Sequence, residues 1–290
     1  MDRQLSRSAR ALLAAFVLVA AATAGESAVP APAIPALTYA DLADLADHAT
    51  VVVRAQVRSV AVVEPARAPG LQPGWARLYI EARTAALLAG PALAGDSLRY
   101  LADVPLDARG KVPKLAKRDV LVFARTVAGR PGELQLVAPD AQVLWDPATE
   151  QRVRGVLGEL LAAGAPGRID RVREAIYVPG NLAGEGETQM FLATADGEPA
   201  SITVVHVPGA APYWSVSFSE LLNTSGKSPT RESLTWYRLA CFLPRKLDPK
   251  ANVSATDADR VQAEADYALV LDSLSPCPRT RGRQVSPLSD

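Results

Sequence analysis

The sequence VVVRAQV, which occupies residues 51–57, is a clear β-strand signal in this chain. The valine and alanine residues at its odd positions alternate with a second set that includes Arg54 and Gln56. An alternation with a period of two is typical of a strand that buries one face and turns the other toward solvent. This part of the chain is therefore expected to form a β-sheet.

Signals on both sides of this stretch extend the sheet. Thr38 and Asp41 match a capping box with Asp in place of Glu, and Leu42 and Leu45 begin an apolar stripe, so a helix is expected over residues 39–47. Short strands separated by Gly, Pro and Asp then predict a small closed barrel or sandwich over residues 38–147. The further strands are expected at residues 77–86, 97–101, 120–126, 133–137 and 142–144.

The composition changes after Pro147, and a second domain of the α+β class is expected over residues 148–279. Apolar residues at helical spacing predict a helix over residues 149–163, and Asp196-Gly197 is a strong hairpin signal between two strands. Strands followed by helices predict an antiparallel sheet with C-terminal helices. The remaining elements are expected as strands at 172–178, 188–194, 201–207 and 214–219 and helices at 231–243 and 257–274, the last capped by Thr256 with Val261, Ala265, Ala268 and Leu271 on its apolar face.

The first 24 residues are expected to be a secretory signal peptide. Three arginines precede an uninterrupted apolar run over residues 11–22, which ends in the small residues Ala22-Thr23-Ala24. That run is too short for a bilayer core of about 30 Å, so the mature chain is expected to have no membrane span. An Ala- and Pro-rich spacer follows over residues 25–37, and residues 280–290 form a tail. The expected location is the periplasm or the extracellular space.

Charge and hydrophobicity narrow the class of protein. Hydrophobic residues make up 49% of the 290 residues, which is enough for a buried core. The formal net charge is 0, and cleavage after Ala24 removes three arginines and one aspartate, which leaves about −2. Nucleic-acid binding calls for a basic face, so a nucleic-acid partner is not expected.

Cysteine and histidine are scarce, and this limits the available chemistry. Cys241 and Cys277 are the two cysteines, and in an oxidising compartment they are expected to form one disulfide, with two buried free thiols as the alternative. Zinc usually takes four ligands, and the chain has only two histidines. Neither a metal nor another cofactor is therefore expected.

The surroundings of the two histidines, His48 and His206, are compatible either with a metal or catalytic site or with a purely structural role. Asp41, Asp44 and Asp47 recur every three residues beside His48, which suggests either a metal site or a solvated helix face near the helix N-terminus; the second interpretation is favoured. His206 lies within a strand pattern and is expected to face solvent or a satisfied core position. No nucleophile motif is present, so no catalytic residue is assigned, although a Ser-His-Asp arrangement stays open.

Two segments are candidate binding sites. The glycine-rich loop that follows Val178 carries Asn181, Glu185 and Glu187, whose oxygens suit a ligand or a cation; the alternative is a plain connection with exposed glutamates. Tyr213 and Trp214 follow a Pro- and Gly-containing stretch, and they either pack in the core or line a groove for a peptide or a glycan.

The first domain resembles a known class of barrel. The run from Ala46 to Val57, together with Leu87–Gly90 and Asp119–Phe123, resembles the opening of many exported bacterial domains. Those domains are similar to the OB-like barrels of the netrin and metalloproteinase-inhibitor type, so the resemblance implies an OB-like barrel over roughly residues 38–145. The amino-terminal cysteine with which the metalloproteinase inhibitors reach zinc is missing, so their activity does not carry over.

These observations favour an exported, soluble and non-catalytic protein that binds an envelope protein, a peptide or a glycan. The first alternative is a secreted or periplasmic hydrolase, which requires His206 or His48 within hydrogen-bond reach of Ser, Asp or Glu. The second is a protease-inhibitor-like barrel protein, which requires an exposed rigid loop near residues 64–76 or 103–118. The sequence does not indicate an oligomeric state.

Overall fold

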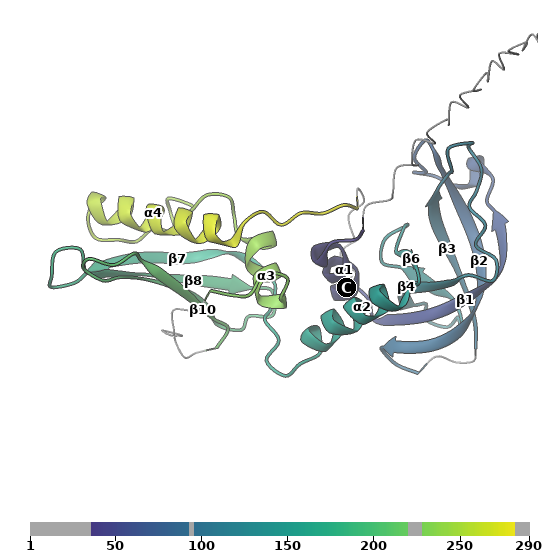
Figure 1. The fold of residues 1–290 in the computed structure, drawn as a ribbon, viewed down its shortest axis with the longest axis horizontal. Coiled ribbons are helices and arrows are strands. Elements are labelled where there is room, and N and C mark those ends of the chain that lie inside the picture. Colours follow the sequence, from purple (N-terminus) through teal and green to yellow (C-terminus); the bar gives the residue numbers. More distant parts are fainter. Residues whose placement is uncertain (1–35, 93–95, 220–227, 282–290) are drawn as a thin grey trace, which may run out of the picture. The chain divides into compact units, whose positions relative to one another are not determined.

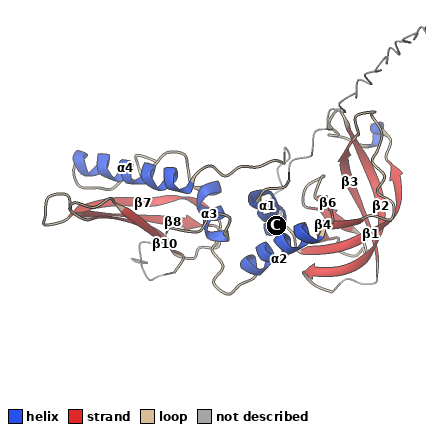
Figure 2. Cartoon of the chain, in the orientation of Figure 1, coloured by secondary structure: helices blue, strands red, loops and turns tan. Residues whose placement is uncertain are grey.

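A computed structural model describes residues 36–92, 96–219 and 228–281. Within these ranges the chain forms four α-helices and two antiparallel sheets, so the expected α+β class is confirmed (Figure 1, Figure 2). The expected signal peptide, nearly all of the expected spacer and residues 282–290 of the expected tail lie outside the described residues.

The first sheet is built around the strand that begins at Val51. Its strand order is β3-β2-β1-β4-β5, and β6 also pairs with β4. The side chains of Val51, Val53, Ala55 and Val57 are fully buried as expected, and those of Arg54 and Gln56 are half-buried. Val52 is 1% exposed because its side of the strand packs into the core cluster that includes α1, so the expected solvent-facing side is wrong at this position. The strands of this sheet are β1 (Val51–Val62), β2 (Trp75–Ala89), β3 (Ser97–Pro105), β4 (Asp119–Thr126), β5 (Leu134–Leu136) and β6 (Gln142–Leu144), with a short 3-10 helix at Pro65–Arg67 between β1 and β2.

Strand β3, at one edge of the first sheet, contacts the segment that carries β5 and β6 at a few separate points, among them a hydrogen bond of 2.7 Å from the Asp103 amide to the Pro139 carbonyl. Arg99 of β3 forms an isolated parallel bridge with Glu133, and its amide donates a hydrogen bond to the Gly132 carbonyl at 2.8 Å. The Tyr100 hydroxyl donates to Gln142 Oε1 at 2.7 Å. A closed barrel requires a continuous ladder between the edge strands, and the pairings of the described residues do not include one.

The second sheet has the strand order β10-β9-β8-β7, and every neighbouring pair is antiparallel. The turn at Asp196-Gly197 joins β8 to β9 as expected, and Gly197 adopts a positive φ of 79°. The outer edge of β7 is met by residues 251–253, because Ala175 donates to the Ala251 carbonyl and accepts from Val253. The strands are β7 (Ile169–Pro179), β8 (Gly186–Thr194), β9 (Ala200–His206) and β10 (Tyr213–Ser217).

Local capping signals fix the helix starts. Asp41 N donates to Thr38 Oγ1 at 3.1 Å and Thr38 N donates to Asp41 Oδ2 at 2.9 Å, so the expected capping box is confirmed. Thr256 and Asp259 form a second capping box. The last helix packs along β7 on one face of the second sheet (Figure 1). The helices are α1 (Tyr39–Asp47), α2 (Pro147–Leu160), α3 (Leu234–Phe242) and α4 (Asp257–Leu274).

The buried face of α4 differs from the expected one. Val261 is 67% exposed, and Ala265 and Ala268 are exposed as well. The predicted stripe is therefore wrong at these three positions, although Leu271 is partly buried against the core. The helix is rotated relative to the prediction, because the buried side includes Asp266, a polar residue that faces the sheet. The residues of α4 that are buried are Ala263, Asp266, Tyr267, Val270 and Leu274.

The hydrophobic core is continuous across the expected boundary between the two domains. One cluster joins Leu42 and Leu45 of α1 to Val153 of α2 and to side chains of the second sheet, α3 and α4. A second cluster is confined to the first sheet and its loops. The boundary at residues 147 and 148 stays a prediction. In the described ranges, every helix is too short or too polar to cross a bilayer.

Candidate functional site

Two of the expected binding residues lie in one row at an end of the second sheet. The cross-strand pairs Val178–Glu187, Glu187–Val205 and Val205–Tyr213 place one residue from each strand side by side. Directly opposite residues share a face of a sheet, so these four side chains lie on the same face. We call Val178, Glu187, Val205 and Tyr213 the cross-strand row.

The cross-strand row and the loops beside it expose apolar side chains. Val178 is 55% exposed and Tyr213 is 39% exposed. Leu182, in the loop between β7 and β8, is 64% exposed, and Val207, directly after β9, is 45% exposed. Groups of exposed apolar side chains with a polar margin are typical of interaction surfaces. Glu187 lies within the row and accepts a hydrogen bond from Gln189 Nε2 at 2.7 Å.

The other loop residues predicted from sequence hold the loop in shape. The Glu185 carboxylate accepts hydrogen bonds from the amides of Asn181 and Leu182, both at 3.1 Å. The Gly180 amide also donates to the Glu185 carbonyl at 2.8 Å. One oxygen of Glu185 is therefore used inside the loop, and the assignment of Asn181 and Glu185 to ligand binding stays a prediction.

Trp214 and Tyr213 lie on opposite faces of β10. Trp214 is 5% exposed and pairs with Val204, which itself pairs with Thr188 on the face that carries α4. Trp214 therefore packs in the core, whereas Tyr213 lies on the exposed face of the sheet.

A histidine–aspartate pair lies on the α4 side of the same sheet. His206 Nε2 is 2.8 Å from Asp266 Oδ1. The Asp266 carboxylate, which is 2% exposed, also accepts hydrogen bonds from Thr188 Oγ1 and Gln262 Nε2. Asp266 is not predicted as a site residue from the sequence, because an aspartate in a helical pattern is usually exposed to solvent.

Neither histidine contacts a hydroxyl or thiol nucleophile within the described ranges. The Tyr177 ring packs edge-on against the His206 ring at 6.1 Å between centroids. Burial, with the charges of Asp266 and Asp259, raises the pKa of the Tyr177 hydroxyl. His48 Nδ1 lies 2.9 Å from the Asp44 carbonyl of its own helix, so this ring closes the end of α1.

The acidic residues of α1 are not on a solvated face, so that interpretation is wrong. We call Asp41, Asp44 and Asp47 the acidic stripe. Asp44 accepts from the Tyr237 hydroxyl at 2.6 Å, and Asp47 accepts two hydrogen bonds of 2.7 Å from Arg238. All three carboxylates pair with side chains or amides from the C-terminal part of the chain.

These partners set the charge states of the acidic stripe. Burial would raise the pKa of Asp41, but hydrogen bonds from Thr280, Thr38 and Arg281 outweigh it and lower the pKa. Burial of Asp47 is likewise outweighed by the hydrogen bond and charge of Arg238, so its pKa is also lowered. Both carboxylates are charged at neutral pH. In the described part of the chain no three potential ligands gather as a metal site would require.

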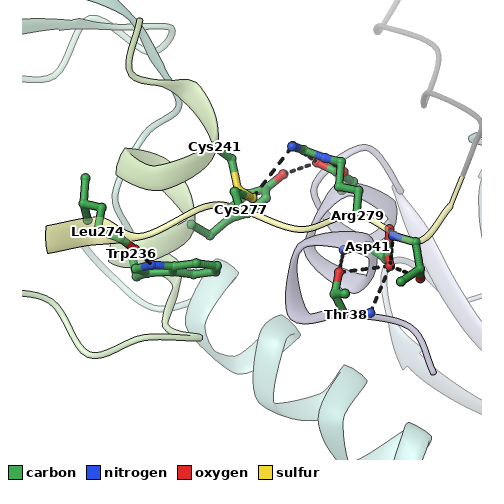
Figure 3. The surroundings of a disulfide bond; sticks show 10 residues. Thr38, Asp41, Trp236, Cys241, Leu274, Cys277 and Arg279 are labelled. Carbon is green, nitrogen blue, oxygen red and sulfur yellow. Dashed lines mark hydrogen bonds and ion pairs between the residues drawn. A yellow bond between two sulfur atoms is a disulfide. The ribbon is translucent and has the colours of Figure 1, made fainter. Parts of the chain in front are cut away.

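The expected disulfide is confirmed. Cys241 at the end of α3 is bonded to Cys277, with 5.3 Å between the two Cα atoms. Figure 3 shows Cys277 and Arg279 on the segment that runs from Leu274 toward Asp41. This bond connects the segment after α4 to α3.

A shallow groove of about 700 Å³ lies beside the acidic stripe. Its lining includes His48 at the end of α1 and Leu161 after α2. It also includes Arg168, directly before β7, and Asp196, in the turn between β8 and β9. Volumes of this size are common for small-molecule sites. The groove is lined by two cations, Arg168 and Arg238, and two anions, Asp47 and Asp196, so its charge does not single out one class of ligand.

Comparison with known proteins adds no assignment. No protein-family model matches the chain, and no curated protein matches it.

Proposed function

We propose that this chain is an exported, non-catalytic binding protein whose cross-strand row docks a polypeptide partner in the cell envelope. The observation that carries the proposal is the exposure of Val178 and Tyr213 in one row, beside exposed Leu182 and Val207. Exposing these side chains to water is unfavourable by about 25 cal/mol per Å² of apolar area, and a partner surface would relieve that.

The chemistry of the row favours a polypeptide over a glycan. Three of its four side chains are apolar or aromatic, and only Glu187 carries a charge. Interfaces between proteins are enriched in tyrosine and depleted in charge at their centre. A glycan site would need more hydrogen-bonding groups around the Tyr213 ring than the row provides.

The remaining parts of the chain fit the same proposal. We take residues 38–147 as an OB-like barrel of the netrin type, an architecture that presents binding surfaces on loops and sheet faces. The bond between Cys241 and Cys277 suits an oxidising compartment, which agrees with export by a leader over residues 1–24.

Site-specific photo-crosslinking tests the proposal. p-Benzoylphenylalanine is placed at Tyr213 and, in a control, at Leu101, which is 50% exposed on β3 of the first sheet. Irradiation of cells that export the protein is expected to give a protease-sensitive adduct from position 213 and none from position 101. Val178→Ser is then added to the variant that carries the crosslinker at position 213, and the amount of adduct is expected to fall several-fold. An unchanged thermal midpoint of this double variant is the folding control.

Equal adducts from both positions, or an adduct that Val178→Ser leaves unchanged, would contradict the proposal. A protease-resistant, glycosidase-sensitive adduct at position 213 would instead assign the row to a glycan.

A hydrolase is the second candidate, and the contact between His206 and Asp266 favours it. A carboxylate that orients an imidazole supplies two of the three members of a nucleophilic triad. A fluorophosphonate probe would label a serine hydrolase of this type, and His206→Gln would abolish the labelling. An unlabelled protein would remove this candidate.

A further inference from the structure

The last described segment of the chain lies on α1. We call Cys277–Arg281 the C-terminal strap. Arg279 donates to both oxygens of Asp44, at 2.6 and 3.1 Å. Thr280 donates to Asp41 Oδ2 through its amide at 3.0 Å and its hydroxyl at 2.6 Å, and Arg281 reaches Asp140 at 2.5 Å.

Polar contacts and one covalent bond hold the C-terminal strap. Its five residues are Cys, Pro, Arg, Thr and Arg, so it has no large aliphatic or aromatic side chain to bury. Its near end is fixed by the bond to Cys241 and, before it, by the hydrogen bond from Trp236 Nε1 to the Leu274 carbonyl at 2.8 Å. The Arg279–Asp44 pair is partly exposed, with side chains 37% and 18% exposed, whereas the Arg281–Asp140 pair is more deeply buried, at 7% and 14%. A native disulfide typically stabilises a protein by about 2–4 kcal/mol, so this bond adds a large share of the strap's attachment beside these polar contacts.

The disulfide is placed where exchange with an external thiol is favourable. Both half-cystines are partly exposed. Arg279 Nη1 lies 3.7 Å from Cys277 Sγ and donates a hydrogen bond to it (Figure 3). A guanidinium at this distance stabilises the negative charge that develops on a departing sulfur. Among the described residues, the sulfur of Cys241 has no such donor.

We infer that the disulfide is a redox-sensitive latch, in which an external dithiol attacks Cys241, expels Cys277 as a thiolate beside Arg279, and frees the C-terminal strap from the acidic stripe. The attack breaks the S–S bond and forms a mixed disulfide on Cys241. The second thiol of the reductant then displaces Cys241. Two electrons and two protons pass to the protein, and the dithiol leaves as its own disulfide.

Helix α1 is expected to stay folded when the C-terminal strap is released. Leu42 and Leu45 are buried in the core, and Thr38 still caps the helix through Asp41. Asp47 stays paired with Arg238. Release would therefore expose Asp41 and Asp44 without unfolding the helix that carries them.

The direction of attack gives the first test. The oxidised mature protein is treated with glutathione, a monothiol that stops at the mixed disulfide, and quenched with acid; peptide mapping then measures the adduct at each cysteine. The adduct at Cys241 is expected to exceed that at Cys277 by about fivefold or more. Arg279→Met is expected to abolish this preference, whereas Arg281→Met, which removes a cation farther along the strap, is expected to keep it.

Release of the strap gives the second test. Dithiothreitol is expected to accelerate tryptic cleavage after Arg279 about tenfold, because the released segment becomes accessible to the protease. The thermal midpoint and the hydrogen exchange of β2 report whether the remaining fold persists. An unchanged cleavage rate, equal glutathione adducts, or global unfolding on reduction would each overturn the latch.

Discussion

Replacing Arg238 with methionine tests how the buried ion pair contributes to stability. The Arg238 side chain is 6% exposed and that of Asp47 is 17% exposed, and two hydrogen bonds of 2.7 Å join them. Arg238 Nε also donates to the Pro166 carbonyl at 2.9 Å. Methionine keeps most of the side-chain volume but leaves the Asp47 carboxylate without its partner.

The expected magnitude follows from that uncompensated charge. Removing one member of a buried, hydrogen-bonded pair destabilises a protein by about 3–5 kcal/mol, because the remaining charge stays partly desolvated. The free energy of unfolding, measured by urea denaturation, is therefore expected to fall by about this amount in Arg238→Met. Adding Asp47→Asn to this variant is expected to restore more than about 1 kcal/mol, which is the coupling of a contacting pair.

The chain offers a matched control. Arg260 and Asp257 form an ion pair at 3.2 Å whose side chains are 50% and 98% exposed. Arg260→Met is expected to change the free energy of unfolding by less than about 0.5 kcal/mol. If Arg238→Met costs no more than Arg260→Met, the reasoning about the buried pair is refuted.

Three further predictions concern local features. Thr256→Ala removes the side-chain cap of α4 and is expected to cost about 1 kcal/mol in urea denaturation, whereas Thr256→Ser should be neutral. Gly90→Ala is expected to lower the thermal midpoint, because Gly90 has φ of 105° and a Cβ would collide with the Thr50 carbonyl; an unchanged midpoint would contradict this. Asp41 and Asp47 have lowered pKa values, so their contribution is present above the unfolded pKa and is lost as the pH falls through the folded pKa. The thermal midpoint is therefore expected to decrease as the pH is lowered below about 4, and this decrease is expected to be smaller in Asp47→Asn.

The sequence predicts local elements well. The helices at residues 39–47 and 257–274 have the predicted bounds, because each begins at a Thr that forms a capping box three residues before its Asp partner. The strand at Gln142–Leu144 also has its predicted bounds. Several other strands differ from their predicted bounds: β2 is longer, since pairing with neighbours on both sides extends it past its apolar run, whereas β5 and β10 are shorter.

Long-range polar contacts are the part that the sequence does not predict. Asp44 and Tyr237 are 193 residues apart, and Thr188 and Asp266 are 78 apart. No periodicity relates such partners, so each carboxylate reads as a solvent-facing residue by composition alone. The same reason explains the error in the buried face of α4, where hydropathy assigns Asp266 to the wrong side.

The candidate site was predicted in part. The sequence singles out Glu187 and Tyr213, and the register of β8, β9 and β10 places them in one row through Val205. Register depends on which strands pair, so the exposed neighbours in that row could not be recognised from spacing.

Residues 251–253 have a consequence for self-association. An open strand edge is a template onto which another chain can add by main-chain pairing, and repeated addition leads to aggregates. Through its two hydrogen bonds with this segment, Ala175 is withheld from any incoming strand. A deletion that removes the segment would leave the outer side of β7 as an unpaired strand edge. Aggregation of such a variant, measured by light scattering, would rise with protein concentration.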